Sequence, residues 1–295
     1  MVSDLFFWEK VERFANRRIR KRIVRAGRKI KRSRYRLERV APRIASLFYF
    51  PQMVAVLLLG FYVRVSRRKW TELRLLFIHI PKTGGSTITQ VLRPHGLVEA
   101  RSVWALWKLV IAHRDGGPRV FTLNHIEPEI LVRVGLCTPQ QLHDVAFTVF
   151  RNPYDRAWSS YRHLVRNPGR RLKHGTGFDE FVELLSGKST WRTKYAKSFG
   201  PSHGAPQSQW VTSRKWLRPK FIFNLERPAE IETFLTSFFG EKIILHRANV
   251  GLPIPSPSHF PNQDSFDRRF ASDFELGGYE FETETNVSSR ERNAG

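Results

Sequence analysis

The feature that most constrains the fold of this chain is an alternation of short apolar segments with helical segments after about residue 70. Near-continuous apolar segments of this length are typical of strands in a parallel sheet that is covered on both faces. Strands are expected at residues 73–80, 119–125, 144–150, 220–226 and 242–246. Helices are expected at residues 86–93, 103–113, 127–134, 153–166, 178–186 and 228–239. The alternation therefore predicts one α/β domain with a central parallel sheet.

Two further segments are expected to be long loops, at residues 187–218 and in the Pro/Ser-rich stretch 251–264. Loops of this length are often functional lids, and otherwise they are simply surface. In a parallel sheet, ligands bind outside the carboxyl ends of the strands. Motifs that directly follow a predicted strand are therefore the first candidates for a functional site.

The positive charge of the chain is concentrated near its N-terminus. The 295 residues carry a formal charge of +24, and residues 1–69 hold 20 Lys and Arg against 4 Asp and Glu, which is +16. The other 226 residues therefore carry only +8. We divide the chain into a basic N-terminal segment, residues 1–69, and a domain at residues 70–295. The single cysteine, Cys137, excludes internal disulfides and a cysteine-rich zinc site.

Residues 8–45 are rich in Arg and Lys, with isoleucine and leucine residues at loosely helical spacing. A helix with a densely cationic face suits an anionic membrane surface or a nucleic-acid backbone. A solvated basic helix without a fixed partner is the alternative.

Residues 47–63 carry no charge over 17 residues, which is short for a membrane span. Pro51 and Gln52 weaken that interpretation further, and cations flank the stretch on both sides, so its orientation is not defined. A marginal span, a helix in the membrane interface and a buried core helix all remain open. Membrane contact is favoured because the basic and the apolar segments fit the same partner.

The first motif is PKTGGST, residues 81–87, directly after the strand expected at residues 73–80. Gly84 and Gly85 allow backbone amides to approach an anion closely, and the N-terminus of the following helix adds its dipole. The lysine adds a mobile positive charge, and the hydroxyl groups add donors. The stretch is not the GxxxxGK[ST] loop of nucleotide triphosphate hydrolases. A glycine turn with an ordinary helix cap is the alternative to a phosphate site.

The second motif is RNPYDRAWSSY, residues 151–161, after the strand expected at residues 144–150. Arg151 ends the strand, Pro153 begins a helix, and Ser159 follows two turns later. An arginine and a serine so placed could hold one phosphate from two sides. A capped helix with surface arginines is the alternative, and Arg156 is expected to be a structural ion-pair partner.

Together, HIPKTGGST and RNPYDRAWSSY resemble the two nucleotide-binding motifs of sulfotransferases that use 3′-phosphoadenosine 5′-phosphosulfate (PAPS). Their form is most similar to the carbohydrate branch, which is related to the heparan and chondroitin enzymes. The resemblance covers roughly residues 73–281 and includes APQSQW, NLER and FASDFELGGYEF. One departure is Ser86-Thr87, where relatives more often have Thr-Ser. The resemblance implies a P-loop-NTPase-like three-layer domain. The N-terminal 70 residues lie outside the resemblance, and their composition predicts a basic and hydrophobic helical appendage.

The resemblance also implies roles for individual residues. Lys82 would stabilise the charge that develops on the leaving 5′-phosphate. The residues that would hold this phosphate are Lys82, Thr83, Gly84, Gly85, Ser86 and Thr87. Arg151 and Ser159 would hold the 3′-phosphate, and no metal would be required.

A base must take the proton from the acceptor hydroxyl. His125 follows the second predicted strand and resembles the histidine that acts as base in the carbohydrate branch. Glu127 is the second candidate. His79 lies within the first strand and is expected to contribute to packing.

The sequence therefore predicts a PAPS-dependent sulfotransferase that acts on a hydroxyl, with a carbohydrate as the favoured acceptor. The alternatives are a small-molecule kinase of related fold and a non-catalytic basic protein that binds membranes or nucleic acid. Membrane association through residues 8–63 is favoured over nucleic-acid binding. The domain would lie in the cytoplasm of a bacterium or in the Golgi lumen of a eukaryote.

Overall fold

The computed structural model describes residues 50–67, 69–101, 103–112, 116–124, 128–165, 177–186, 204–212, 218–246 and 260–281. The chain divides into two compact units, residues 1–54 and residues 55–295, and the second unit contains the sheet. The basic segment at residues 8–45 lies outside the described residues.

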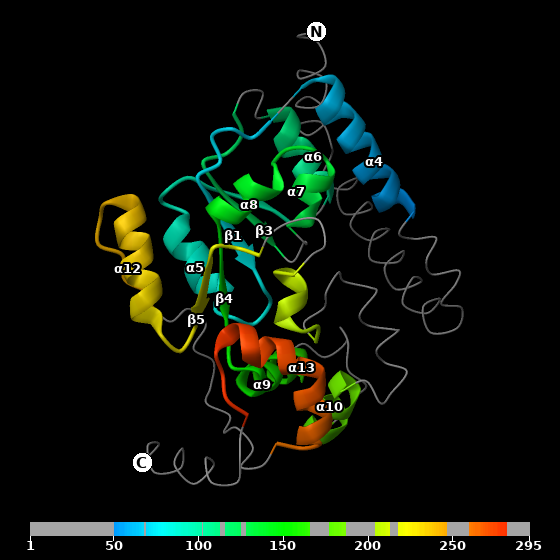
Figure 1. Ribbon diagram of the computed structural model, residues 1–295, viewed down its shortest axis with the longest axis vertical. Helices are drawn as coiled ribbons and strands as arrows, with labels where there is room; N and C mark the ends of the chain where they lie inside the picture. Colours follow the sequence, from blue (N-terminus) through cyan, green and yellow to red (C-terminus); the bar gives the residue numbers. More distant parts are fainter. Residues whose placement is uncertain are drawn as a thin grey trace, which may run out of the picture. The chain divides into compact units, whose positions relative to one another are not determined.

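Five parallel strands form the sheet, in the order β2-β3-β1-β4-β5. Figure 1 labels β1, β3, β4 and β5. They are β1 (Leu75–His79), β2 (Leu97–Ala100), β3 (Val120–Asn124), β4 (Ala146–Phe150) and β5 (Phe221–Asn224). Buried threonine hydroxyls on both neighbours of the central strand donate to carbonyl oxygens of β1. Thr122 donates to Phe77 and Thr148 donates to Ile78, each over 2.9 Å. The expected α/β domain with a central parallel sheet is confirmed.

The described helices are α4 (Phe50–Val65), α5 (Gly85–Leu92), α6 (Val103–Ala112), α7 (Glu129–Arg133), α8 (Pro139–Val145), α9 (Pro153–Val165), α10 (Phe178–Ser186), α12 (Pro228–Phe239) and α13 (Gln263–Gly277). A short 3-10 helix, η2, spans Gln207–Trp210. None of the helices in the described part of the chain has the length and apolar character needed to cross a membrane.

The sheet is covered by helices on both faces, because successive side chains of a strand point to opposite sides. Leu76 and Ile78 of β1 belong to a core cluster that includes residues of α4, α6, α7 and α8. Leu75 and Phe77 belong to a second cluster that includes residues of α5 and α12. The domain therefore has three layers, with the two sets of helices on either side of the strands (Figure 1).

A third apolar cluster joins α9, α10 and α13, which lie together in Figure 1. Helix α13 contributes Phe266, Phe270 and Phe274, which are spaced four residues apart and are all buried. This spacing places the three rings on one helix face. The cluster holds α9, which begins with the second predicted phosphate motif, against the C-terminal helix.

Helix α4 has one buried and one exposed apolar face. Ala55, Leu59 and Val63 are at most 2% exposed, and the last two belong to the first core cluster. The side chains on the other face are 54–70% exposed: Leu57, Leu58, Phe61 and Val65. From Ala55 onward, the apolar segment at residues 47–63 is therefore a helix of the domain core that keeps an apolar outer face.

The strand predicted at residues 242–246 is wrong, because these residues form no strand. Side chains of α12 take up their backbone donors instead: Ile243 N–H donates to Thr236 Oγ1 over 3.0 Å, and Leu245 N–H donates to Glu232 Oε1 over 2.7 Å. The sheet instead contains β2, which was not predicted from the sequence. Helices α8 and α13 were not predicted either. The N-terminal cap of α8 is Thr138, whose hydroxyl accepts from Gln141 N–H.

Candidate active site

The predicted phosphate motifs follow β1 and β4, which are neighbours at the point where the order of the strands reverses. After β1 the chain forms β2 and β3 on one side, and it then crosses to β4 on the other side. Ligands of parallel sheets bind at such a point, outside the carboxyl ends of the strands. Adjacent strands are about 4.8 Å apart. The segments that follow His79 and Phe150 therefore begin side by side.

The loop after β1 contains two residues in the left-handed region, Lys82 with φ 72° and Gly84 with φ 79°. For a lysine this conformation costs about 1–2 kcal/mol, and such strain is common at ligand-binding sites. Gly84 is the N-terminal cap of α5 and offers no side chain that could accept from the first amides of the helix. The helix therefore begins without a side-chain cap, as expected for an N-terminus that binds an anion.

Close packing explains the two glycines of this loop. A Cβ at Gly84 would lie 2.5 Å from Leu225 Cδ1, and a Cβ at Gly85 would overlap the imidazole ring of His79. Neither position has room for a side chain. The two glycines therefore allow the loop to pack closely against Leu225 and His79.

The three hydroxyl groups of the loop differ in their surroundings. The Thr83 hydroxyl is fully buried and donates to the carbonyl oxygen of Ile80 over 3.0 Å, so it stabilises the loop itself. Ser86 is exposed and Thr87 is half-buried. Lys82, also half-buried, stands before them at the start of the turn.

The second motif begins with Arg151, which is half-buried at the end of β4. Asn152 caps α9, since its Oδ1 accepts from the backbone N–H of Tyr154 over 3.0 Å and of Asp155 over 3.4 Å. Proline at the first helical position suits such a start. Ser159 lies two turns along α9 and is half-buried.

A buried guanidinium links the two motifs. Arg156 Nε donates to the carbonyl oxygen of Pro81 over 3.0 Å, and Nη1 donates to the carbonyl oxygen of Ala205 over 2.8 Å. Burial lowers the pKa of Arg156 to about 10, and the charge of Asp273 opposes this shift. Arg156 therefore connects the start of the first loop with a third segment, residues 204–212.

This third segment contacts the second motif through Gln207. The side-chain amide of Gln207 is fully buried and pairs with both backbone groups of Arg151. Its Oε1 accepts from Arg151 N–H over 2.9 Å, and its Nε2 donates to Arg151 C=O over 2.8 Å. Asp273 holds the segment from the other side, since its carboxylate accepts from Gln207 N–H over 2.7 Å and from Ser208 N–H over 2.8 Å.

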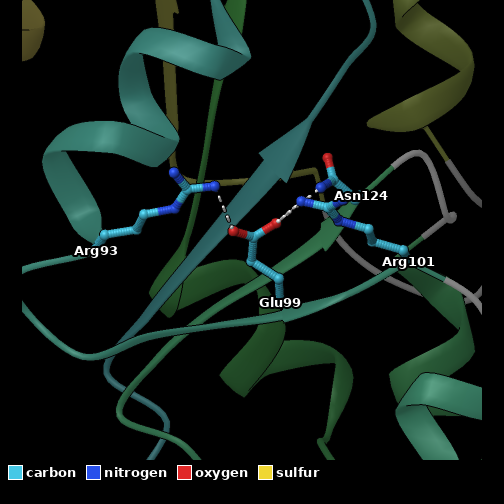
Figure 2. Close-up of polar contacts among 4 residues, drawn as sticks. All are labelled: Arg93, Glu99, Arg101 and Asn124. Atoms are coloured by element: carbon cyan, nitrogen blue, oxygen red, sulfur yellow. Dashed lines mark hydrogen bonds and ion pairs between the residues drawn. The ribbon is translucent and has the colours of Figure 1, made fainter.

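Polar side chains also meet beside the carboxyl end of β3 (Figure 2). Glu99 accepts from Asn124 Nδ2 over 3.0 Å, from Arg101 over 3.1 Å and from Arg93 over 3.3 Å. Asn124 is the last residue of β3 and pairs with His79 of β1. Both candidate bases, His125 and Glu127, lie outside the described residues, and β3 ends at the residue before His125.

His79, a half-buried residue at the end of β1, lies against Gly85 of α5 and stacks on Phe77 with 5.5 Å between ring centroids. Burial lowers its pKa to about 4, while a hydrogen bond with Asn124 acts in the opposite direction. The imidazole is therefore neutral at pH 7. Its surroundings are those of a packed side chain, as the sequence analysis expected.

Two residues of this region received no role from the sequence, Gln207 and Asp273. Both lie in stretches that contributed to the family resemblance, APQSQW and FASDFELGGYEF. The family resemblance therefore marked both stretches. The hydrogen bonds that Gln207 and Asp273 make could not be predicted, because they join residues more than 50 positions apart.

No curated protein matches the sequence significantly. Among solved structures, mouse sulfotransferase SULT7A1 complexed with PAP is similar, with 15% identity and a TM-score of 0.37. The match covers 70% of this chain and 66% of the mouse chain, which is just under two thirds of the mouse enzyme. Residues 71–242, more than half of the chain, match the family model described as "Sulfotransferase family". The chain therefore belongs to the sulfotransferase family.

Proposed function

We propose that the protein transfers a sulfuryl group from PAPS to a hydroxyl group. The observation that carries this proposal is the placement of the two motifs after β1 and β4, the adjacent strands at the reversal point of the sheet. One nucleotide with phosphates at its 3′ and 5′ positions can then contact both motifs at once. Membership of the sulfotransferase family supports the same chemistry.

The 5′-phosphate binds at the N-terminus of α5. The backbone amides from Thr83 to Ser86 would bind it, and the hydroxyls of Ser86 and Thr87 would add donors. The N–H of Thr87 donates to the carbonyl oxygen of Gly84 over 2.9 Å. Thr83 acts through its backbone, because its hydroxyl is engaged with Ile80. Lys82 adds the positive charge that the leaving phosphate requires.

The 3′-phosphate binds between the guanidinium of Arg151 and the hydroxyl of Ser159. Arginine matches the geometry of phosphate oxygens and keeps its charge at all physiological pH values. The two residues come from the end of β4 and from the second turn of α9.

The transfer is an in-line displacement at sulfur. The acceptor oxygen forms the new S–O bond while the bond from sulfur to the 5′-phosphate oxygen breaks. His125 takes the proton of the acceptor hydroxyl, and adenosine 3′,5′-bisphosphate leaves with its new charge stabilised by Lys82. A positioned base contributes on the order of 10²–10⁴ in rate, and preorganised charge contributes a comparable factor.

We extend the proposal to a carbohydrate acceptor that carries negative charge. The two motifs resemble those of the carbohydrate branch, and arginines stand at the rim beside β3 (Figure 2). The side chains of Arg93 and Arg101 are 56% and 70% exposed, although both contact Glu99. An exposed guanidinium can bind a sulfate or carboxylate of a glycan bidentately.

Binding of adenosine 3′,5′-bisphosphate is the primary test, measured by calorimetry on the full chain. Arg151→Ala and Lys82→Ala should each weaken binding roughly 10- to 100-fold, as expected when a charged hydrogen bond is lost. Arg119→Ala is the matched control, since this exposed arginine precedes β3 at the amino end of the sheet. Absence of saturable binding by the unmodified protein overturns the proposal.

Transfer from labelled PAPS to glycans, lipids and phenols tests the acceptor. A signal with anionic glycans supports a carbohydrate acceptor, whereas a signal with phenols alone contradicts it. His125→Ala should abolish transfer and leave the affinity for adenosine 3′,5′-bisphosphate nearly unchanged. Undiminished transfer by this variant would assign the base to another residue, with Glu127 the first to test.

The proposal includes membrane association through the outer face of α4. This face exposes four apolar side chains, and Arg64, Arg67 and Lys69 are exposed at its C-terminal end. Its 16 residues span about 24 Å, which is less than the ~30 Å core of a bilayer. Because the opposite face is packed in the domain core, α4 lies along the membrane surface in this proposal. Anionic lipids fit the cations of α4 and of residues 8–45.

Sedimentation with vesicles of phosphatidylglycerol or phosphatidylcholine tests this association on the full chain. The double variant Leu57→Glu/Phe61→Glu should lose binding to anionic vesicles, and binding by the unmodified protein should weaken as salt rises. Ile244→Glu is the control, since Ile244 is an apolar residue outside α4 that is 48% exposed. Equal binding by the double variant and the control contradicts a role for this face.

A further inference from the structure

The buried side chain of Gln207 continues the hydrogen bonding of the sheet beyond the end of β4. The ladder between β4 and β5 ends at the pair Phe150 and Asn224. At the next residue, Arg151, the amide of Gln207 supplies both an acceptor and a donor, as a neighbouring strand would. The backbone that carries the Arg151 guanidinium is thereby fixed on both of its polar groups.

Gln207 is itself held from two sides. The carboxylate of Asp273, on α13, accepts from the N–H groups of Gln207 and Ser208. Arg156, on α9, donates to the carbonyl oxygen of Ala205, two residues earlier. The side chains of Arg156 and Asp273 are buried, so water does not compete for these bonds.

Arg156 also reaches the other motif, since its Nε donates to the carbonyl oxygen of Pro81. A continuous set of buried contacts therefore runs from Pro81 through Arg156, Ala205 and Gln207 to Arg151. It begins at the residue before Lys82 and ends at the arginine assigned to the 3′-phosphate. The spacing of the two phosphate sites is set by this connection as well as by the sheet.

We propose that Gln207 is a positioning residue that selects for a nucleotide phosphorylated at its 3′ position. It does not touch the nucleotide in this proposal. It fixes the backbone of Arg151 so that the guanidinium meets a 3′-phosphate at the distance from Lys82 that a 3′,5′-bisphosphate requires. The proposal rests on the proposed function, because Arg151 must bind the 3′-phosphate for Gln207 to act through it.

Selectivity between two nucleotides is the readout, because a general loss of stability would not change it. Affinities for adenosine 3′,5′-bisphosphate and adenosine 5′-phosphate are measured by calorimetry on the full chain. Gln207→Met keeps the length of the side chain but removes both hydrogen bonds to Arg151. It should weaken binding of the bisphosphate by roughly tenfold, and binding of the 5′-phosphate should change less than twofold.

The neighbouring Gln209 provides the matched control. It lies on the same 3-10 helix but is exposed. Gln209→Met should leave both affinities unchanged. In an Arg151→Ala background, Gln207→Met should have no further effect on the bisphosphate, because the two residues act through one contact.

Gln207→Glu keeps the inference testable if the methionine variant does not fold. A neutral carboxylic acid has one acceptor and one donor, as the amide has, whereas a carboxylate can only accept. The preference of Gln207→Glu for the bisphosphate over the 5′-phosphate, compared with that of the unmodified protein, should therefore be lost at high pH. It should recover as the pH falls. Loss without recovery at low pH contradicts the inference.

The outcomes separate this inference from the proposed function. If the unmodified protein does not prefer the bisphosphate, or if Arg151→Ala keeps that preference, the assignment of the 3′-phosphate site fails. If Arg151→Ala loses the preference but Gln207→Met retains it, only the role of Gln207 is overturned.

Discussion

The imidazole of His79 occupies the space that a side chain at Gly85 would need. His79 is the last residue of β1, and Gly85 is the first residue of α5. The strand and the helix on either side of the loop proposed to bind the 5′-phosphate therefore touch through a histidine and a glycine. This contact sets how closely the helix N-terminus approaches the end of the strand.

Gly85→Ala should weaken the affinity for adenosine 3′,5′-bisphosphate by about tenfold or more, because the new Cβ pushes α5 away from β1. The second change His79→Ala removes the ring and should restore part of the affinity. Calorimetry on the two single variants and the double variant measures this coupling. Independent effects of the two changes would show that the contact does not position the loop.

The lowered pKa of His79, about 4 against an ordinary value of 6.5, links folding to pH. Between these values the unfolded chain binds a proton that the folded protein does not, so the free energy of unfolding falls as the pH falls. The contribution from His79 is present above pH 6.5 and amounts to roughly 2–4 kcal/mol, lost by about pH 4. Urea denaturation at pH 7 and pH 4.5 measures the slope, which His79→Gln should reduce. An unchanged slope in that variant would assign the pH dependence to other groups.

Substitutions of Lys82 should differ in their effect on stability but not in their effect on transfer. Its φ of 72° suits glycine, so Lys82→Gly should be more stable than Lys82→Ala by about 1 kcal/mol. Both variants should lose transfer by roughly 10²–10³ because the leaving phosphate loses its positive partner. Denaturation curves and initial rates with labelled PAPS separate the two effects. Retained transfer in Lys82→Gly would contradict the role of the ammonium group.

Segments with strong local signals were predicted well from the sequence. Helix α12 begins at Pro228 and ends before Gly240, the two residues that mark helix ends most clearly, and its bounds match the prediction. Strand β2 was not predicted, since it has four half-buried to buried residues that include Glu99. Helix α13 was not predicted because charged residues surround its phenylalanines, although their spacing of four was visible.

The two predicted phosphate motifs each follow a strand directly, and the strands that precede them are adjacent in the sheet. The connection between them could not be predicted. Arg156 was expected to be an ion-pair partner. The charge of Asp273 does act on it, but its described hydrogen bonds are to the backbone oxygens of Pro81 and Ala205. Such contacts depend on the tertiary fold, and no local pattern in the sequence encodes them.

Removing the Arg156 guanidinium should destabilise the fold in a pH-dependent manner. Burial raises the pKa of Asp273, and Arg156 opposes that shift. In Arg156→Met the pKa of Asp273 should rise further, so the folded protein binds a proton that the unfolded chain has released. The free energy of unfolding should then fall as pH rises above the ordinary carboxyl range, with a loss of about 3–5 kcal/mol at neutral pH.

Asp273→Asn in the Arg156→Met background removes the unpaired buried charge and should recover part of the lost stability. Urea denaturation of the single and double variants at pH 5 and pH 8 measures both effects. A penalty in Arg156→Met that does not depend on pH would show that the carboxylate of Asp273 is not the group left uncompensated.

Leu58 and Leu59 are adjacent on α4 and should respond to substitution in opposite ways. Leu59 is fully buried in the core, so Leu59→Ala should cost about 2–5 kcal/mol of unfolding free energy. Leu58 is 54% exposed, so Leu58→Ala should change stability by less than about 0.5 kcal/mol. Leu58→Ala should instead weaken binding to phosphatidylglycerol vesicles, because its side chain belongs to the face proposed to enter the interface. A large loss of stability in Leu58→Ala, without a change in vesicle binding, would place the outer face of α4 against protein.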